Sequence, residues 1–460
     1  MARLPYLLLA VVLMGSFAFH GYRAEHPTSS YQSADERSYG KLAINIAEDR
    51  HYGDGSTGMR DPLHWPPGAP MLFAAGHKVF PSAESERTQD LPSAYWLQAV
   101  VSLGTTLAAF GLAWALAGAW AGLLAAALVG FYPPLILATG EQLSEPLGAF
   151  LLICAFLAFA LAARRRLLAL YAVAGVAVGL AVLTRADLLP VPFLIALIAA
   201  VWIWRRRHDW RRGAVVGGLI AAGTVLAIIP WSLYASTRAE EFVPVTRGSG
   251  SALFVGTYLP GNGTTVGMKR DLGDEAKLRN PKLRGTPDFD LEARSVLAVV
   301  ADRRPELEFN QAVAAEGRKN LVRYGLKEPV EFAGMMLNKV QRMWTRYSRG
   351  GARPTNGVIR AWHIVLVLAT VGGLLVGVFK RRSVLLGCIL AAVLISTAVH
   401  MLVVSQARYN LPLMPSLIAG GVAGWFLLLR RPPERRPISR PHGESVQSEP
   451  DSLPSGAAPG

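Results

Sequence analysis

The feature that most constrains this chain is a series of uncharged apolar runs, each long enough to cross a lipid bilayer. A helix needs about 20 residues to span the hydrocarbon core, and 52% of the 460 residues are hydrophobic. A water-soluble protein would instead distribute its apolar residues with the period of an amphipathic helix or strand. We therefore predict an all-α polytopic membrane protein with about ten transmembrane helices. The predicted spans are 4–21, 93–113, 117–136, 144–163, 167–184, 187–204, 214–234, 358–379, 383–404 and 409–429.

The basic residues account for the formal net charge of +15 and are not scattered. Their clusters lie at the ends of apolar runs, as cytoplasmic loops of membrane proteins show. We therefore place the clusters and both termini in the cytoplasm, and we expect no nucleic-acid partner. The clusters are Arg164–Arg166, Arg205–Arg207 with Arg211–Arg212, Lys380–Arg382, and Arg430–Arg431 with Arg435–Arg436.

The first apolar run has two interpretations. Arg3 and the apolar residues after it are the ingredients of a secretory signal peptide. However, Ser16-Phe17-Ala18 is a poor small-x-small cleavage site, and removal of the span would disturb the sidedness of the other spans. We therefore predict an uncleaved anchor.

This topology places two long segments outside, residues 22–92 and 235–357. The apolar stretch 66–80 is too short to span and is predicted to be an interfacial helix, whereas 289–347 has the periodicity of charged helices. The chain is thus divided into an N-terminal membrane module (1–234, with the outer loop 22–92), a small helical outer subdomain (235–357), C-terminal transmembrane helices (358–430) and a disordered cytoplasmic tail (431–460).

Two adjacent acids, Asp35 and Glu36, follow the first span in the outer loop. Adjacent carboxylates diverge, so one can face a reaction centre while the other binds a cation or a structural partner. A carboxylate at a membrane surface suits the general base of a transferase. The alternatives are a solvated pair or an N-cap of the helical stretch 36–49.

Further charges lie at outer span ends, where topology does not require them. Glu141 and Glu145 flank a short turn, and charges at membrane depth are functional candidates unless they simply favour a helix dipole or reach the interface. Arg185 and Arg408 stand on the side that the positive-inside rule disfavours, and an outer cation suits a lipid phosphate. A local ion pair of Arg185 with Asp187 is the alternative.

Arg60 and His64 in the first outer loop complete this polar set, although a single loop histidine is more often only solvated. The chain has no His-Glu-x-x-His zinc motif, phosphate-binding loop or nucleophile elbow.

Taken in order, several short motifs resemble the GT-C membrane glycosyltransferases, and within them the dolichyl-phosphate-mannose-protein mannosyltransferase family (glycosyltransferase family 39-like), which includes protein O-mannosyltransferases and aminoarabinose transferases. The resemblance extends from about residue 4 to 429. Its motifs are Asp35-Glu36, Tyr39-x-x-Leu42-Ala43, Pro66-Pro67-Gly68-x-Pro70, Ser144-Glu145-Pro146, Leu183-Thr184-Arg185, Ile229-Pro230-Trp231, Val243-Pro244-Val245 and Arg408-Tyr409-x-x-Pro412.

The resemblance implies transfer of a sugar, with inversion, from a polyprenyl monophosphate on the non-cytoplasmic face of the membrane. It implies Asp35 as catalytic base with Glu36 as its partner, and Arg185 and Arg408 near the donor phosphate. Before the Pro-Pro run, family members often carry Arg or Lys, whereas this chain has His64-Trp65 with Arg60 four residues earlier. The resemblance therefore does not decide which cation of this loop meets the phosphate.

The leading hypothesis is an inner-membrane glycosyltransferase with a periplasmic site, a polyprenyl-phosphate donor and a glycan, lipid or protein acceptor. Its expected catalytic residues are Asp35 and Glu36, and its expected phosphate-binding residues are Arg185, Arg408, Arg60 and His64. Glu141, Glu145 and Tyr39 are expected to support them, and Asp35 or Glu36 is the candidate ligand of a divalent metal ion. The alternatives are a transporter or flippase of lipid-linked sugars or anionic lipids, and a non-catalytic scaffold. The sequence does not identify the sugar, the acceptor, the polyprenyl length or the oligomeric state.

Overall fold

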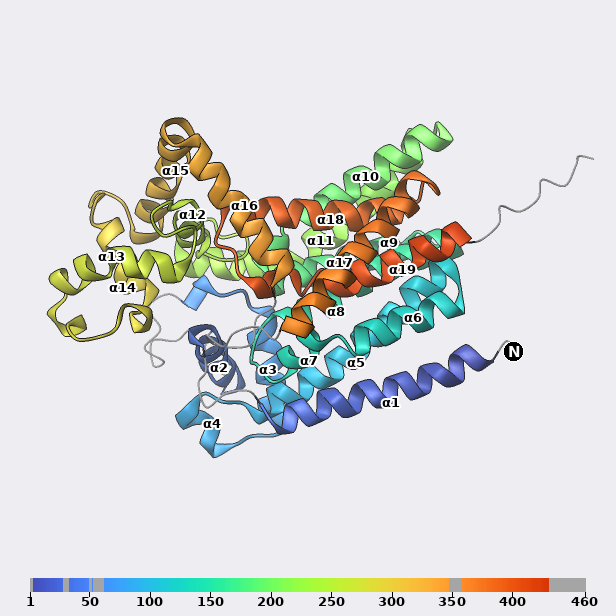
Figure 1. Ribbon diagram of the computed structural model, residues 1–460, viewed down its shortest axis with the longest axis horizontal. Coiled ribbons are helices and arrows are strands. Elements are labelled where there is room, and N and C mark those ends of the chain that lie inside the picture. Colours follow the sequence, from blue (N-terminus) through green and yellow to red (C-terminus); the bar gives the residue numbers. More distant parts are fainter. Residues whose placement is uncertain (1–2, 28–32, 49–51, 53–61, 347–356, 430–460) are drawn as a thin grey trace, which may run out of the picture.

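The structure is a computed structural model that describes residues 3–27, 33–48, 52, 62–346 and 357–429. Within these ranges the chain forms α-helices and short 3-10 helices, and no strand (Figure 1). The predicted tail 431–460 and Arg60 lie outside the described residues.

Each predicted span coincides with an apolar helix or helix pair, which confirms the all-α membrane fold. In the described ranges, seven helices have the length and apolarity to cross a membrane, and the pair α6 and α7 would be an eighth. The two shorter apolar helices are α9 and α19, with 16 residues each. The bounds are α1 (Leu4–Glu25), α5 (Pro92–Ala117), α6 (Ala119–Gly130), α7 (Pro133–Thr139), α8 (Glu145–Arg165), α9 (Ala169–Thr184), α10 (Pro190–Arg207), α11 (Trp210–Ala239), α17 (Gly357–Phe379), α18 (Val384–Leu402) and α19 (Met414–Leu429).

Two predicted spans differ in detail from the helices. The run 117–136 is not one straight helix, because α6 and α7 meet at an angle of 52°. Pro133 and Pro134 begin α7 there, and the residue before a proline is driven out of helical conformation. The last span begins at Met414 rather than at 409, because residues 407–410 form the separate 3-10 helix η6 (Ala407–Asn410).

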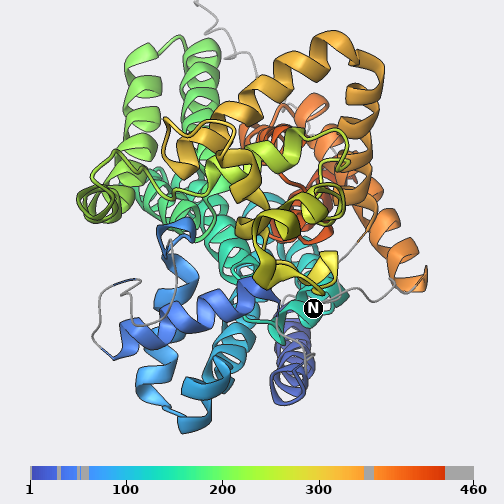
Figure 2. The same ribbon diagram turned by 90° about the vertical axis from the view of Figure 1, so that its left-hand side faces the viewer.

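Two polar regions lie at one end of the bundle, away from the N-terminus of α1 (Figure 1), and Figure 2 looks onto that end. The first region comprises α2 (Ala34–Ala47), η2 (Pro62–His64), α3 (Gly68–Val79) and α4 (Ala83–Thr88). The second comprises α12 (Ser249–Thr257), α13 (Thr265–Arg279), η4 (Pro281–Leu283), η5 (Asp288–Asp290), α14 (Ala293–Ala301), α15 (Phe309–Lys327) and α16 (Pro329–Thr345).

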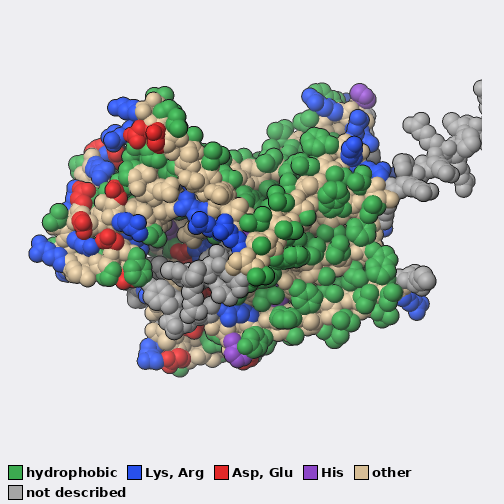
Figure 3. Space-filling model, viewed as in Figure 1, with side chains coloured by type: hydrophobic (Ala, Val, Ile, Leu, Met, Phe, Trp, Pro, Cys, Tyr) green, Lys and Arg blue, Asp and Glu red, His purple; other side chains and the backbone are tan. Residues whose placement is uncertain are grey.

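The second polar region has a hydrophobic core of its own, which includes Phe254, Met268 and Val296. It touches the first region where the Arg247 N–H donates to the Leu63 carbonyl at 2.9 Å. Figure 3 shows charged side chains over this region and hydrophobic side chains over much of the bundle, as expected for helices that face lipid.

The apolar stretch 66–80 contains α3, which is half in the protein core. Phe73 and Ala74 are buried in a cluster with Tyr39 and Leu91, whereas Phe80 at its end is exposed. One apolar face is thus packed against protein while a second remains at the surface.

Small residues allow close packing of the last helices. Gly373 of α17 and Gly424 of α19 lie so close that a Cβ atom at Gly424 would collide with the Gly373 carbonyl. Such glycine contacts are typical of membrane helices, whose backbones approach closely. The contact fixes α19, and with it the preceding η6.

Candidate active site

The first helix of the outer loop presents Asp35 at its N-terminus. Ser33 caps α2: its hydroxyl accepts from the Glu36 N–H, and the Glu36 carboxylate accepts from the Ser33 N–H at 2.7 Å. This reciprocal capping box satisfies two of the free N–H groups at the helix start. Asp35 lies in the same first turn, where the helix dipole favours an anion.

The Asp35 carboxylate forms an ion pair with Arg408 of η6. The Asp35 side chain is 26% exposed and the Arg408 side chain 13%, so the pair stands at the edge of the buried interior. A charge-assisted hydrogen bond of this kind is stronger than a neutral one. Asp35 is therefore partly accessible but held by a cation.

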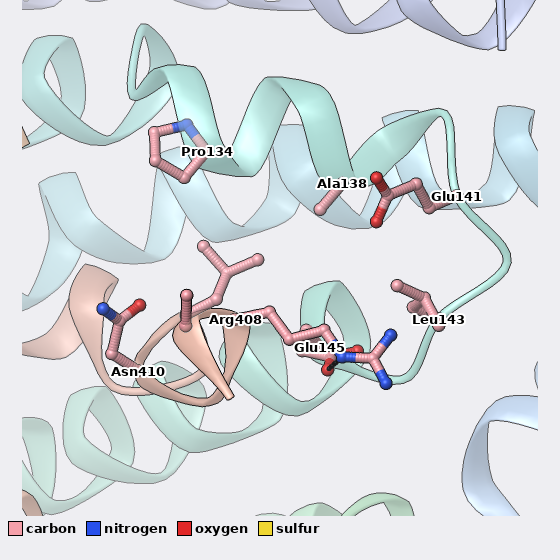
Figure 4. Close-up of a pocket in the computed structure, with 9 residues that line it drawn as sticks. Pro134, Ala138, Glu141, Leu143, Glu145, Arg408 and Asn410 are labelled. Carbon is pink, nitrogen blue, oxygen red and sulfur yellow. Dashed lines mark ion pairs between the residues drawn. The ribbon is translucent and has the colours of Figure 1, made fainter. Parts of the chain in front are cut away.

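A second carboxylate, Glu145, bridges two arginines. Its Oε1 atom lies 3.2 Å from Arg408 Nε and 3.0 Å from Arg185 Nη1, and the Glu145 side chain is only 3% exposed. Glu145 is the first residue of α8, where an anion favours the dipole. Figure 4 shows the Arg408 guanidinium close to Glu145.

The series continues beyond Arg185. Arg185 Nε lies 3.2 Å from Asp187 of the 3-10 helix η3 (Ala186–Leu188), and Asp187 lies 3.6 Å from His400 Nε2 of α18. Acids and cations thus alternate in the order Asp35, Arg408, Glu145, Arg185 and Asp187. This arrangement compensates each buried charge with a neighbour of opposite sign.

The aromatic ring of Tyr409 packs against the guanidinium groups of both arginines. Its ring centre lies 4.9 Å from the Arg185 guanidinium carbon and 5.8 Å from that of Arg408. A cation over an aromatic face is attracted by the ring quadrupole. Burial raises the pKa of Tyr409 to about 12, so its hydroxyl is neutral at physiological pH.

Both arginines remain cations in this setting. Burial lowers the pKa of Arg185, but Asp187 and Glu145 outweigh it, and the net pKa is raised. Burial likewise lowers the pKa of Arg408, and Glu145 and Asp35 outweigh it. Two permanent positive charges are therefore held side by side.

These groups do not use all of their hydrogen-bonding capacity within the described residues. Glu145 Oε2, Arg185 Nε and Arg408 Nε are buried without an aligned hydrogen-bond partner, although both Nε atoms lie near carboxylates. Most buried polar groups in folded proteins have a hydrogen-bond partner, so buried polar atoms without one often mark a binding site. Two buried N–H groups that point at no aligned acceptor favour an anionic ligand here.

A cavity of about 20 Å³ opens beside Arg408 and Glu145, which is room for about one water molecule. Figure 4 shows its lining, with Glu141 on the side facing Arg408. A sugar does not fit this volume, so ligand binding at this point requires side-chain movement. The lining residues are Pro134, Ala138, Glu141, Leu143, Glu145, Ala407, Arg408, Asn410 and Leu411.

Glu36 has a structural position in this geometry. Besides capping α2, its Oε1 accepts from the Gln142 N–H at 3.2 Å, and its side chain is buried. Gln142 in turn bonds Leu91 N–H and the Gln89 carbonyl. Glu36 thereby fixes α2 to the turn that precedes Glu145.

Tyr39, one turn after Asp35 on α2, also belongs to the site. Burial raises the pKa of its hydroxyl, with a further contribution from Asp35, while a hydrogen bond with Ser144 opposes this. Its ring packs edge-to-face on Trp65 at 5.4 Å.

Among the described residues, the aromatic ring contact of His64 is with Trp65 and not with the two arginines. Its ring packs on Trp65 at 4.9 Å, and its atoms occupy the space that a side chain at Gly248 would need. The structure therefore places His64 at the end of η2, against the start of α12.

Position 410 ties η6 to the bundle. Asn410 Nδ2 donates to the Met343 carbonyl, and His363 Nε2 lies 3.1 Å from the Trp344 carbonyl. Because a carbonyl can only accept, Nε2 carries the proton, and Nδ1 accepts from the Tyr132 hydroxyl at 2.7 Å. This network holds the segment that carries Arg408.

Sequence reasoning did not select His400 or Tyr409 as site residues. A single histidine near the end of an apolar run carries no periodic signal, and a tyrosine after Arg408 reads as an interface residue. The available signals for Tyr409 were its adjacency to an unexpected outer arginine and its place in the motif Arg408-Tyr409-x-x-Pro412. As to metal ions, the described part of the chain contains no group of three His, Cys, Asp or Glu side chains placed to hold one.

Comparison with known protein families finds a match over residues 64–233, to the family described as dolichyl-phosphate-mannose-protein mannosyltransferase. This match confirms the resemblance to that family over the residues that it covers, and the motifs at Asp35 and Arg408 lie outside it. No curated protein sequence matches the chain.

Among solved structures, the chain is similar to the archaeal oligosaccharyltransferase AglB from Archaeoglobus fulgidus. With the form in complex with an inhibitory peptide and a dolichol-phosphate, the TM-score is 0.51 at 15% identity, over 92% of this chain and 50% of AglB. With the form tethered to an acceptor peptide containing the NVT sequon, the TM-score is 0.55 at 15% identity, over 93% and 49%. This chain thus spans about half the length of AglB and shares its membrane fold.

A further match is ArnT from Cupriavidus metallidurans bound to undecaprenyl phosphate, with a TM-score of 0.38 at 17% identity, over 91% of this chain and 77% of ArnT.

Proposed function

We propose that this protein is a membrane glycosyltransferase that transfers a sugar from a polyprenyl-phosphate donor to an acceptor. The observation that carries the proposal is the buried pair Arg185 and Arg408, bridged by Glu145, with Asp35 paired to Arg408. Asp35 comes from α2 of the first polar region, whereas Glu145 and Arg185 stand at the ends of the apolar helices α8 and α9, so the group lies where the bundle meets a polar region. A lipid phosphate needs both environments at once.

The arginines are suited to the phosphate. A guanidinium matches the geometry of phosphate oxygens and keeps its charge at any physiological pH. The Nε atoms of Arg185 and Arg408 have no aligned hydrogen-bond acceptor among the described residues, so phosphate oxygens can take that place. Their charge also stabilises the leaving group, because the phosphate gains a negative charge as the sugar departs.

Asp35 is suited to act as the base. In the transfer step the acceptor O–H gives its proton to the Asp35 carboxylate, and the acceptor oxygen bonds to the anomeric carbon of the sugar. The bond from that carbon to the phosphate oxygen breaks, and its electron pair stays on the phosphate. Attack from the face opposite to the phosphate inverts the anomeric centre. A positioned base of this kind contributes roughly 10²–10⁴-fold to the rate.

The ion pair of Asp35 with Arg408 sets the order of steps in the proposed reaction, with donor binding before deprotonation of the acceptor. While Arg408 holds Asp35, the carboxylate is a weaker base. A donor phosphate that draws Arg408 toward itself frees Asp35 at the moment when a sugar is in place. After transfer Asp35 is protonated and no longer competes for Arg408, and its later deprotonation restores the pair and favours release of the polyprenyl phosphate.

The finer assignments belong to the same proposal. We assign the protein to the inner membrane, with this site on the periplasmic side, because the basic clusters lie at the opposite helix ends. The acceptor is a hydroxyl-bearing glycan, lipid or protein, and the two arginines supply the charge that a divalent metal ion provides in other phosphate sites.

Transport of a lipid-linked sugar is the second candidate, and one observation favours it. The bent pair α6 and α7 resembles the discontinuous helices that form transporter binding sites at the bilayer midplane. However, the charged residues described above lie at helix ends. Transfer needs a base beside the phosphate-binding cations, whereas binding and release of a lipid-linked sugar need the cations alone, so the geometry favours transfer.

The test is a transfer assay on the purified full chain in lipid, with radiolabelled polyprenyl-phosphate sugars and mixed acceptors. Label that leaves the lipid with the wild-type protein but not with Asp35→Asn supports the proposal. If the donor stays intact in every reaction while labelled donor crosses the bilayer of proteoliposomes, the protein is a transporter and the proposal fails.

A further inference from the structure

A larger hollow lies at the opposite end of the bundle from the candidate active site. Its volume is about 780 Å³, which falls in the range of roughly 300–1,000 Å³ typical of small-molecule sites. It is formed by the last turns of α10 and by the turn between α17 and α18. The lining residues are Leu197, Ile198, Val201, Trp202, Arg205, Arg206 and Arg382.

The α10 residues of this groove form two parallel rows. Leu197, Val201 and Arg205 are spaced four apart, and so are Ile198, Trp202 and Arg206. Residues four apart lie one above another on a helix surface. Each row therefore presents two apolar side chains and then a cation, in the direction of the helix end.

The basic end of the groove is held in place by the protein. The Arg206 guanidinium stacks over the Trp202 ring at 5.1 Å, and its Nη1 donates to the Arg382 carbonyl at 3.4 Å. Arg382 has a φ of 50°, a left-handed conformation that is strained for residues other than glycine. The contact to Arg206 helps to hold the α17–α18 turn against α10.

No acid in the described part of the chain forms an ion pair with Arg205, Arg206 or Arg382. The nearby Asp209 accepts from the Arg212 N–H and caps α11. Figure 3 shows Lys and Arg side chains gathered over this end, with hydrophobic side chains next to them. Three cations converge here without acidic partners, which contrasts with the compensated arginines of the active site.

We propose that this groove binds an anionic glycerophospholipid of the surrounding bilayer. The phosphodiester headgroup meets Arg205, Arg206 and Arg382, and an acyl chain follows the apolar rows toward Leu197. A soluble anion would use the arginines but leave the apolar rows uncovered, and a zwitterionic lipid would bring its own cation to three others. The groove therefore selects a lipid with net negative charge.

This lipid site is separate from the proposed donor site. Arg185 and Asp187 stand just before α10, and the groove lies at the end of that helix, which spans about 27 Å at 1.5 Å per residue. The proposal does not depend on the catalytic activity of the other end.

The test is native mass spectrometry of the delipidated full chain with phosphatidylglycerol or phosphatidylcholine of the same acyl chains. The wild-type protein is expected to bind phosphatidylglycerol at least tenfold more tightly. The variant R205Q/R206Q/R382Q should lose this preference, and Val201→Trp, which fills the apolar part and keeps every arginine, should weaken phosphatidylglycerol binding as well.

The matched control is R164Q/R165Q/R166Q, which removes the same charge from a basic cluster outside the groove. It should bind phosphatidylglycerol as the wild-type protein does, and thermal unfolding in detergent verifies that each variant is folded. Equal losses in both triple variants would show only general attraction to basic helix ends and would overturn the proposal. Displacement of phosphatidylglycerol by a lower concentration of undecaprenyl phosphate would also overturn it, because the occupant would then be the carrier lipid.

Discussion

Asp35 and Arg408 form an ion pair although 373 positions separate them in the sequence. Asp35 comes from the first turn of α2 and Arg408 from η6, and each helix is fixed by contacts of its own. Glu36 fastens α2 to the turn at Gln142, which precedes Glu145, and Asn410 fastens η6 to α16. Other hydrogen bonds therefore hold α2 and η6 in place, and the ion pair between Asp35 and Arg408 can break while both segments keep their positions.

From this relationship we predict that Asp35→Asn separates donor binding from transfer. Transfer should fall by about 10²–10⁴-fold, because the base is removed. Binding of polyprenyl phosphate should become tighter by roughly fivefold, because the competitor for Arg408 is gone and an ion pair at this exposure is worth about 1 kcal/mol. Equilibrium binding of a radiolabelled polyprenyl phosphate to purified protein measures the second effect.

Glu36→Gln is the matched control for that experiment, since it changes the adjacent carboxylate. Glu36 bonds backbone N–H groups rather than an arginine, so its replacement should leave the affinity for polyprenyl phosphate unchanged. If Asp35→Asn binds polyprenyl phosphate no better than wild type, Asp35 and the phosphate do not compete for Arg408. That result would not contradict the role of Asp35 as the catalytic base, which the rate of transfer tests separately.

A further prediction concerns Glu145, which holds the two arginines together. Glu145→Gln leaves Arg408 with Asp35 and Arg185 with Asp187, but removes their shared counter-charge. Breaking a buried pair costs about 3–5 kcal/mol, and we expect the lower end of this range because each arginine keeps one acid. The unfolding temperature in detergent should therefore fall by several degrees.

The comparison variant for Glu145 is Glu84→Gln, which removes an exposed pair with Arg87. Its unfolding temperature should match that of the wild-type protein, since surface pairs contribute little. An unchanged unfolding temperature in Glu145→Gln would mean that Glu145 does not stabilise the arginine pair.

Much of this architecture follows from local pattern. Apolar runs predicted the membrane helices because a run of about 20 apolar residues is what a membrane-spanning helix requires. The cost of charge at the outer span ends singled out Arg185, Arg408 and Glu145, and the structure brings all three together.

What the sequence could not supply is the pairing of distant segments. Nothing in the sequence near Asp35 indicates that η6 supplies its partner. Glu36 differs from Asp35 only in the folded structure, where its carboxylate accepts a hydrogen bond from the Gln142 N–H. The bend before Pro133 was readable in principle, because a proline pair inside an apolar run disfavours a straight helix. His64 packs against Trp65 and Gly248, and its expected contact with a phosphate stays a prediction.

Chelation provides a test of where the charge at the phosphate comes from. Arg185 and Arg408 keep their protons and lie side by side, so we predict that transfer persists in EDTA at its untreated rate. Loss of transfer in EDTA, restored by magnesium or manganese, would contradict this prediction and would indicate Asp35 and Glu36 as metal ligands.

The variant Arg408→Lys keeps the positive charge but not the planar geometry of the guanidinium. Its KM for the donor should be higher than that of the wild-type protein, because two parallel hydrogen bonds to phosphate are lost.

The last prediction concerns Lys339 of α16, a fully buried lysine that joins the second polar region to the bundle. Its Nζ donates to the Gly256 carbonyl at 2.8 Å and to the Met401 carbonyl at 2.6 Å. Burial, with a smaller contribution from Arg342, lowers the pKa of Lys339 to about 7 from its ordinary value of 10.5. Because the folded state holds this proton less tightly than the unfolded state does, unfolding takes up a proton between pH 7 and 10.5.

The contribution of Lys339 to the free energy of unfolding should therefore rise as pH increases from about 7 to 10.5, and be flat below that range. Thermal unfolding in detergent at a series of pH values, compared between wild type and Lys339→Met, isolates this term, since other titrating groups are common to both. Lys319→Met, at an exposed position of α15, should keep the wild-type slope. If Lys339→Met keeps that slope too, Lys339 is not the group whose proton is lost on folding, and the contact between α16 and α18 does not respond to pH.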